Sequence, residues 1–276
     1  MKIAALYDVH GNLPALEAVL DDLRAAEVDR VVIGGDVVPG PMPSESLALL
    51  LDLDLPVEFV RGNGERIVLA QRAGEPIDEI PEPHRNGIRW NAAQLGSEQA
   101  ATIATWPLTT SLRVGGLGEV FFCHATPRDD NELFTRTTDQ ARLEPVFGEL
   151  EADLVVCGHT HMPFDRTICG VRVVNAGSVG MPFGEPGADW LLLGEGIEPQ
   201  RTTYDLEAAA ARVRATGCPG ADELARGVLE PPSAKADGGA LRAGGARSPP
   251  EPVKLTGRSA RSAGSPGAAT PRSPPA

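Results

Sequence analysis

The sequence predicts an α/β fold in which a parallel sheet is packed against a second sheet. In the N-terminal half, short apolar segments alternate with amphipathic helical segments, as in strands joined by crossover helices. From residue 111 onward, apolar segments follow one another with only one helix among them, at 139–150. A polar stretch at 65–106 separates the two halves and breaks the alternation.

The first half holds three predicted strands and two helices. Leu16, Leu20 and Leu23 recur at helical spacing, so residues 13–26 should form a helix with one apolar face. Ser44 is expected to cap the second helix. In chain order the elements are a strand at 3–7, a helix at 13–26, a strand at 30–33, a helix at 44–51 and a strand at 56–60.

Residues 65–106 form a predicted helical insertion. The segment holds three prolines in its first part, then shows helical patterns at 84–95 and 97–105. It is expected to sit on the sheet, as a cap over the site described below.

The second half holds seven predicted strands. Cys169-Gly170 and Gly194-Glu195-Gly196 are short glycine-containing connections of the kind found in hairpins, and 115–118 is a further hairpin turn. The strands are expected at 111–114, 119–123, 153–157, 164–168, 171–175, 190–193 and 198–204. Two helices should follow, one at 205–216 that begins with Asp205 as its cap and one near 221–226.

Composition divides the chain into a body and a tail. At 276 residues and 42% hydrophobic, the chain can bury one sizeable core, assigned to a domain at 1–230. Residues 231–276 are rich in Pro, Gly, Ala, Ser and Arg without apolar periodicity, so disorder is expected there. The net charge is −13, and seven basic against two acidic residues give the tail +5, which leaves −18 on the body. An acidic body argues against non-specific binding of nucleic acid.

The first residues do not follow the pattern of a secretory signal, and no apolar segment reaches the ~18–20 residues of a membrane span. The four cysteines, at 123, 157, 169 and 218, lie at no metal-ligand spacing and are expected to be reduced thiols. A cytoplasmic protein that does not bind membranes is therefore expected; the sequence leaves the oligomeric state open.

Seven side chains that can bind metals follow predicted strands in short turns. Two pairs, Asp8 with His10 and His159 with His161, have the i, i+2 spacing that places both side chains on one face of an extended backbone. Ligands at the carboxyl ends of neighbouring strands converge on one crevice of an α/β sheet. The full set is Asp8, His10, Asp36, Asn63, His124, His159 and His161.

Three oxygen ligands and four imidazoles are too many for one tetrahedral ion and suit two ions that share a carboxylate. Ligands of this mixed type favour Mn, Fe, Zn, Ni or Co over Ca, and Mn is the first expectation. We therefore expect two divalent metal ions as cofactors.

The order Asp8-x-His10, Gly35-Asp36, Gly62-Asn63, His124 and Gly158-His159-Thr160-His161 resembles the five blocks of the calcineurin-like metallophosphoesterases, above all their small bacterial and archaeal phosphodiesterase branch. The resemblance covers about residues 1–204. It implies a four-layer α/β/β/α sandwich and hydrolysis by a metal-activated water. It also implies that Asp8, His10 and His161 hold one ion, that Asn63, His124 and His159 hold the other, and that Asp36 bridges them.

One position departs from the family pattern. The third block usually has a histidine after Gly-Asn, which is thought to assist the leaving group, whereas this chain has Gly64. Asp36 and Asn63, as ligands of the metal ions that would share the attacking water, then remain the catalytic candidates. Leaving groups that need no protonation, such as nitrophenol or pyrophosphate, would suffer least.

These features predict a phosphodiesterase or phosphatase for a small phosphate ester. Arg128 and Asn12 are candidate substrate contacts; Arg61 and Arg66 are further candidate cations, and Asn12 could instead brace its own turn. Two alternatives stay open. One is a pyrophosphohydrolase of nucleotides or dinucleoside polyphosphates, and the other is a catalytically inert metal-binding scaffold.

Overall fold

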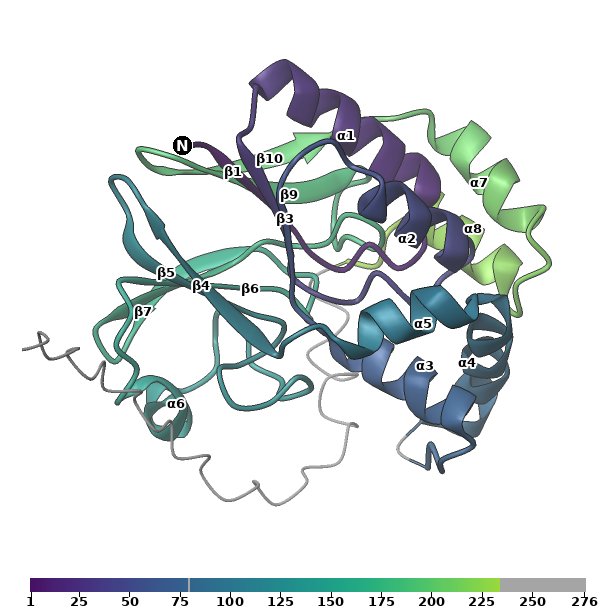
Figure 1. The fold of residues 1–276 in the computed structure, drawn as a ribbon, viewed down its shortest axis with the longest axis horizontal. Helices are drawn as coiled ribbons and strands as arrows, with labels where there is room; N and C mark the ends of the chain where they lie inside the picture. The colour runs from purple at the N-terminus through teal and green to yellow at the C-terminus, as the bar shows by residue number, and fades with distance from the viewer. Residues whose placement is uncertain (79, 234–276) are drawn as a thin grey trace, which may run out of the picture. The chain divides into compact units, whose positions relative to one another are not determined.

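The computed structural model describes residues 1–78 and 80–233, and its first sheet has the predicted parallel core (Figure 1). Three strands, β1 (Ile3–Leu6), β2 (Arg30–Ile33) and β3 (Val57–Phe59), pair in parallel and are connected by two helices, α1 (Leu13–Ala26) and α2 (Pro43–Leu51). The apolar face of α1 is buried, and Asn12 caps the helix by accepting the Ala15 N–H. The alternation of strand and helix in the sequence therefore predicted this part of the fold.

The second sheet has the order β4-β5-β6-β8-β7. Its strands are β4 (Thr109–Val114), β5 (Gly118–Cys123), β6 (Leu154–Cys157), β7 (Phe164–Ile168) and β8 (Val171–Asn175), with helix α6 (Gln140–Phe147) between β5 and β6. The hairpins expected at 115–118 and 169–170 are present, because β4 pairs antiparallel with β5 and β7 with β8.

The expectation that the whole second half forms the second sheet is wrong for its last two strands. β9 (Ala188–Leu193) pairs antiparallel with β1, and β10 (Ile197–Thr202) forms the expected hairpin with β9, so both complete the first sheet in the order β10-β9-β1-β2-β3. Pairing between residues almost 190 positions apart depends on tertiary packing, and no local pattern in the sequence encodes it.

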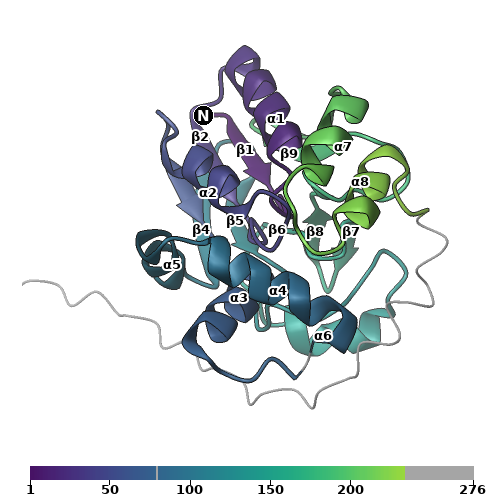
Figure 2. The ribbon, with the colours of Figure 1, turned by 90° about the vertical axis from the view of Figure 1, so that its right-hand side faces the viewer.

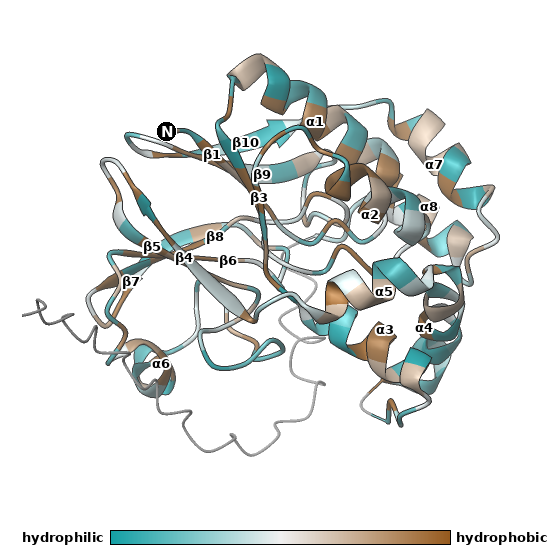
Figure 3. Ribbon diagram, in the orientation of Figure 1, coloured by the Kyte–Doolittle hydropathy of each residue, from teal (hydrophilic) through white to brown (hydrophobic). Residues whose placement is uncertain are grey.

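Three apolar clusters define the four layers (Figure 3). One lies between the first sheet and its helices and includes Leu6, Val31 and Leu16. A second lies between the two sheets, and the third lies between the second sheet and α6. In Figure 3 hydrophobic stretches, drawn in brown, occur in strands of both sheets, while β10 is largely hydrophilic. Successive residues of β1 point to opposite faces, Ile3 to the sheet interface and Ala4 to the helices, so the strand is covered on both sides. The α/β/β/α sandwich is thus confirmed.

The insertion contains one helix more than predicted. Helices α4 (Glu82–Gln94) and α5 (Ser97–Ala104) match the expected segments, whereas α3 (Asn63–Ala73) was not predicted. The three helices extend the apolar cluster on the helical face of the first sheet. Ser44 does not cap α2: Met42 is the cap residue, Pro43 opens the helix, and the Ser44 hydroxyl donates to Gln99 Oε1 at 2.8 Å.

Helices α7 (Leu206–Arg214) and α8 (Ala221–Leu229) lie side by side next to α1 (Figure 2). Asp205 caps α7 as predicted, by accepting the Ala208 N–H. The predicted disordered tail at 231–276 lies outside the described residues except for 231–233. The four cysteines are free thiols, and none of the described helices has both the length and the apolar character of a membrane span.

Candidate metal centre

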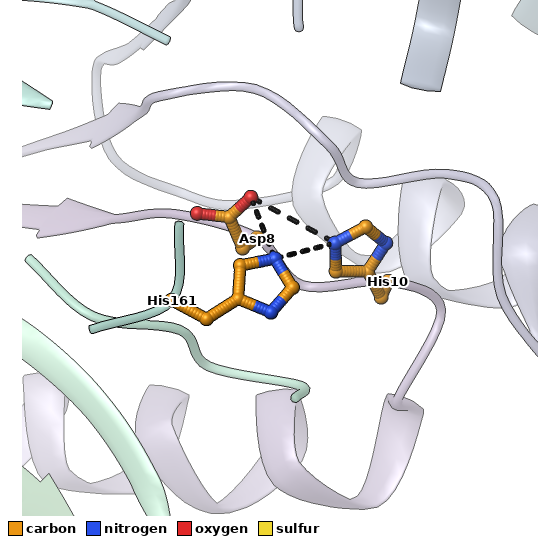
Figure 4. Close-up of side chains that lie close together, drawn as sticks. All are labelled: Asp8, His10 and His161. Atoms are coloured by element: carbon orange, nitrogen blue, oxygen red, sulfur yellow. Dashed lines mark hydrogen bonds and ion pairs between the residues drawn. The ribbon is translucent and has the colours of Figure 1, made fainter. Parts of the chain in front are cut away.

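The structure brings Asp8 and His10, from the turn after β1, together with His161, from the turn after β6 (Figure 4). The Nε2 atoms of His10 and His161 are 3.1 Å apart. Asp8 Oδ1 lies 3.2 Å from His161 Nε2 and 3.7 Å from His10 Nε2. Figure 4 shows the three side chains pointing toward one another. Three donor atoms therefore face a common point, as the ligands of a cation do.

A second group gathers Asp36, His124 and His159, whose ligand atoms lie within 4.8 Å of one another. His124 Nε2 is 3.0 Å from Asn63 Oδ1 and 3.5 Å from Asp36 Oδ1. With Asn63 added, the four side chains come from the turn after β2, the first residue of α3, the residue after β5 and the turn after β6.

Asp36 lies between the two groups. Its Oδ2 is 3.7 Å from His10 Nε2, while its Oδ1 faces His124 of the second group. Asp8 Oδ1 is likewise 3.9 Å from His124 Nε2. All seven predicted side chains thus form one cluster, and the Asp36 carboxylate occupies the position that a bridging ligand would need.

The backbone at these turns is unusual. Among the described residues, seven that are not glycine have φ in the left-handed region, and five of them belong to this cluster. The five are Asp8 (φ 55°), His10 (46°), Asp36 (54°), His159 (65°) and His161 (57°). Such conformations cost about 1–3 kcal/mol each and persist only where the surroundings enforce them, as they do at functional sites.

Three of the imidazoles are oriented by hydrogen bonds to the backbone. In each, the Nδ1–H donates to a main-chain carbonyl, which leaves the Nε2 lone pair directed into the cluster. The pairs are His10 with Pro39 O (3.1 Å), His124 with Gly34 O (2.9 Å) and His161 with Met181 O (2.9 Å). This arrangement is the one in which neutral histidine binds a metal.

Two buried atoms of the cluster have no hydrogen-bond partner, Asp8 Oδ1 and His159 Nε2. The other oxygen of Asp8 accepts the backbone N–H of His159 at 2.8 Å. Burial of an unpaired carboxylate oxygen or ring nitrogen is costly, so native proteins rarely leave such atoms unmatched. The residues present therefore fit divalent cations, which would be bound by these two atoms.

The pKa values reflect concentrated negative charge. Burial acts against ionisation of Asp8, but His161 and His10 outweigh it and hold the pKa of Asp8 well below its usual range. Burial also opposes protonation of His10, yet the neighbouring carboxylates of Asp8 and Asp36 raise its pKa to about 9. Burial, together with His124, lowers the pKa of His159 to about 3. The cluster attracts positive charge, while His159 stays neutral as a ligand must.

The glycine at position 64 fills a space with no room for a side chain. A Cβ placed there would lie 2.1 Å from Val38 O, 2.7 Å from Pro39 Cδ and 2.8 Å from Asp36 Oδ1. The Gly64 N–H donates to Asp36 Oδ1 at 2.7 Å. The histidine of the family pattern is thus replaced by close packing between two loops.

The candidate arginines differ in their partners. Arg128 is exposed and forms a bidentate pair with Glu132, and Arg66 forms one with Asp130. Arg61 Nε is buried without a hydrogen-bond partner, and within the described residues Arg61 forms no ion pair.

Asn12 is buried and has the bracing role that was the alternative for this residue. Its oxygen caps α1, and its Nδ2 donates to Gly180 O at 2.9 Å.

Two residues outside the predicted ligand set support the cluster. Ser178 Oγ donates to Asp8 O at 2.7 Å, and the Glu65 carboxylate accepts three backbone N–H groups beside Asp36. For Glu65 a signal was available: a glutamate three residues after the cap position Gly62 is the spacing of a capping box.

Comparison with known proteins gives one family and several related structures. A model of the calcineurin-like phosphoesterase superfamily domain matches residues 1–193. An uncharacterised protein of Methanocaldococcus jannaschii is 29% identical over 234 residues, covering 76% of this chain and 91% of the relative. The crystal structure of a metallophosphoesterase from Sphaerobacter thermophilus is 26% identical, covers 83% of this chain and 98% of its own, and gives a TM-score of 0.66. A hypothetical protein from Pyrococcus horikoshii shares the fold at 19% identity, with 82% of this chain and 97% of its own covered and a TM-score of 0.68.

Proposed function

Because this chain belongs to the calcineurin-like phosphoesterase superfamily, whose members are metal-dependent phosphoester hydrolases, we propose that it hydrolyses small phosphate esters at the cluster around Asp36. The observation that carries the proposal is the convergence of seven donor side chains, two of them with buried unpaired atoms. Asp8, His10 and His161 would hold one divalent ion, Asn63, His124 and His159 a second, and Asp36 would contact both. Bound there, two divalent ions supply a water of lowered pKa and offset charge on the phosphoryl oxygens.

The chain's own residues determine which substrates suit the site. Gly64 leaves the cluster without an acid at the family's usual position, and the packing around it excludes any side chain there. Substrates whose leaving group departs as a stable anion are therefore favoured, such as aryl phosphates and pyrophosphates. Arg128 would have to leave Glu132 before it could contact a phosphoryl oxygen, whereas no ion pair among the described residues holds Arg61.

A pyrophosphohydrolase of nucleotides is a second candidate, favoured by one observation. The Phe183 ring lies 6.2 Å from the His161 ring between centroids, and Met181 beside it is 42% exposed. An apolar surface next to the first group could contact a nucleobase.

The test is hydrolysis by protein freed of metal and reloaded with Mn, Ni or Co. Bis-p-nitrophenyl phosphate, p-nitrophenyl phosphate and dinucleoside polyphosphates would separate the diesterase, monoesterase and pyrophosphohydrolase activities. Asp36→Asn should reduce turnover by at least about a hundredfold, since even the outer partners of metal ligands contribute 10–100-fold. Asp165→Asn, an exposed aspartate in β7, is the matched control. Two bound ions with no turnover on any substrate would instead identify an inert scaffold.

A further inference from the structure

Glu65 is the only glutamate among the buried polar and charged side chains of the described residues. It lies in the first turn of α3, two residues after Asn63, and its exposed fraction is 0%. A carboxylate in such a place needs compensation, because moving a charge out of water costs several kcal/mol.

Both oxygens of Glu65 accept hydrogen bonds from the backbone of the two neighbouring metal-binding turns. Oε2 accepts from Asp36 N at 2.9 Å and from Gly62 N at 2.8 Å, and Oε1 accepts from Val38 N at 3.1 Å. One side chain thus joins the turn after β2 to the turn after β3. Hydrogen bonds to a carboxylate are about twice as strong as those between neutral groups, so the link is firm.

This carboxylate forms no ion pair among the described residues. Within residues 1–78 and 80–233, no lysine, arginine or histidine lies within ion-pair distance of Glu65, and after burial it is the like-charged Asp36 that most opposes its ionisation. If Glu65 only anchored α3, a neutral cap would do so without this repulsion. The charged acceptor is explained by the three N–H groups, which converge from two loops and need acceptor atoms alone.

The turn that Glu65 holds is a strained one. Asp36 has φ of 54°, and its carboxylate is also held by Gly64 N, the residue next to Glu65. We propose that Glu65 is a positioning residue that holds Asp36 and Asn63 in the metal-binding arrangement before any ion is bound. The proposal rests on the proposed function, since it assigns Asp36 and Asn63 as ligands.

Glu65→Gln tests the proposal, because the amide keeps the size but turns one acceptor into a donor that faces an N–H. We expect the metal-free variant to fold and to bind divalent Mn or Co 10–100-fold more weakly than the wild type, measured by calorimetry and by metal content after dialysis. The control is Asp189→Asn in β9, which removes another buried carboxylate and should leave metal affinity unchanged. Wild-type affinity in Glu65→Gln would overturn the proposal, as would a lower melting temperature with unchanged affinity per folded molecule.

A second measurement needs no variant. In the metal-free wild type, hydrogen exchange at the amides of Asp36, Val38 and Gly62 should be as slow as at Ile33 in β2, because Glu65 holds them without the ions. Exchange at the rate of exposed loop amides would overturn the proposal. Neither readout depends on turnover, so absence of hydrolysis refutes the proposed function while leaving this assignment to be decided by metal affinity and amide protection.

Discussion

Gly64→Ala tests whether close packing, rather than an empty space, stands where the family has a histidine. The new Cβ would lie 2.1 Å from Val38 O and 2.7 Å from Pro39 Cδ, far inside contact distance, and neither atom belongs to the far end of a flexible side chain. The backbone of one loop must therefore shift. Overpacking of this kind costs about 1–3 kcal/mol, and because it disturbs Asp36 as well, we expect the upper part of that range.

Gly87→Ala is the matched control for this substitution. Gly87 lies inside α4, and nothing lies within 4 Å of the position its Cβ would take. Replacing glycine by alanine inside a helix should stabilise the metal-free protein by about 0.5–1 kcal/mol. Urea unfolding followed by circular dichroism measures the free energy of unfolding of both variants, and it separates a loss of stability from a gain.

The free energy of unfolding should decrease in Gly64→Ala and increase in Gly87→Ala. A Gly64→Ala protein that is as stable as the wild type and binds metal equally well would refute the packing argument. A Gly64→His protein with increased turnover would refute it more strongly, because the imidazole would then have found room beside Asp36.

Four further predictions concern the metals, the pH dependence, the thiols and the tail. Chelation of bound metal should lower the melting temperature, since ligands that bind only the folded state stabilise it, and calorimetry with added EDTA measures this. The pKa of His159 in the metal-free fold, about 3, lies below the ~6.5 of an unfolded histidine, so its contribution to stability is present above pH ~6.5 and is lost as the pH falls toward 3. The urea concentration at the midpoint of unfolding should therefore decrease as the pH is lowered through that window, and it should decrease less steeply in His159→Gln. Cys169, the one cysteine that is not buried, should react with a thiol reagent before Cys123, whose pKa is raised by burial, and mass spectrometry of labelled peptides would show the reverse order if this is wrong. Deletion of 234–276 should leave turnover unchanged, because no proposed ligand lies there, and a large loss would assign a role to the tail.

Elements with strong local signals could be predicted from the sequence to the residue. Helix α1 and strands β2, β7 and β8 have the predicted bounds, since apolar periodicity and turn residues are local properties of the chain. Helix α3 lacked such a signal. Its buried side chains include only two aliphatic ones, Ile67 and Val68, and Glu65 faces backbone rather than solvent, so the segment reads as polar. Its stability comes from tertiary contacts that the sequence does not display.

The candidate site was predictable in its membership and not in its conformation. Histidines and carboxylates after successive strands predicted a common site, and the structure places all seven side chains in one cluster. The left-handed backbone at residues such as Asp36 and His161 could not be predicted, because asparagine, aspartate and histidine adopt it only when surrounding contacts enforce it. The packing at Gly64 likewise involves Val38 and Pro39, which only the folded loops bring near.

The pairing of β1 with β9 has a consequence for the order of events during synthesis. Asp8 is synthesised long before its partners, because its turn is secured by Ser178 Oγ and by Gly180 N, which donates to Asp8 O at 3.0 Å. Neither partner leaves the ribosome until some 170 further residues have been made, at about 5–20 residues per second. The ligand that is made first among the seven is thus among the last to be fixed, and premature metal capture by the nascent chain would involve a turn not yet held in its left-handed form.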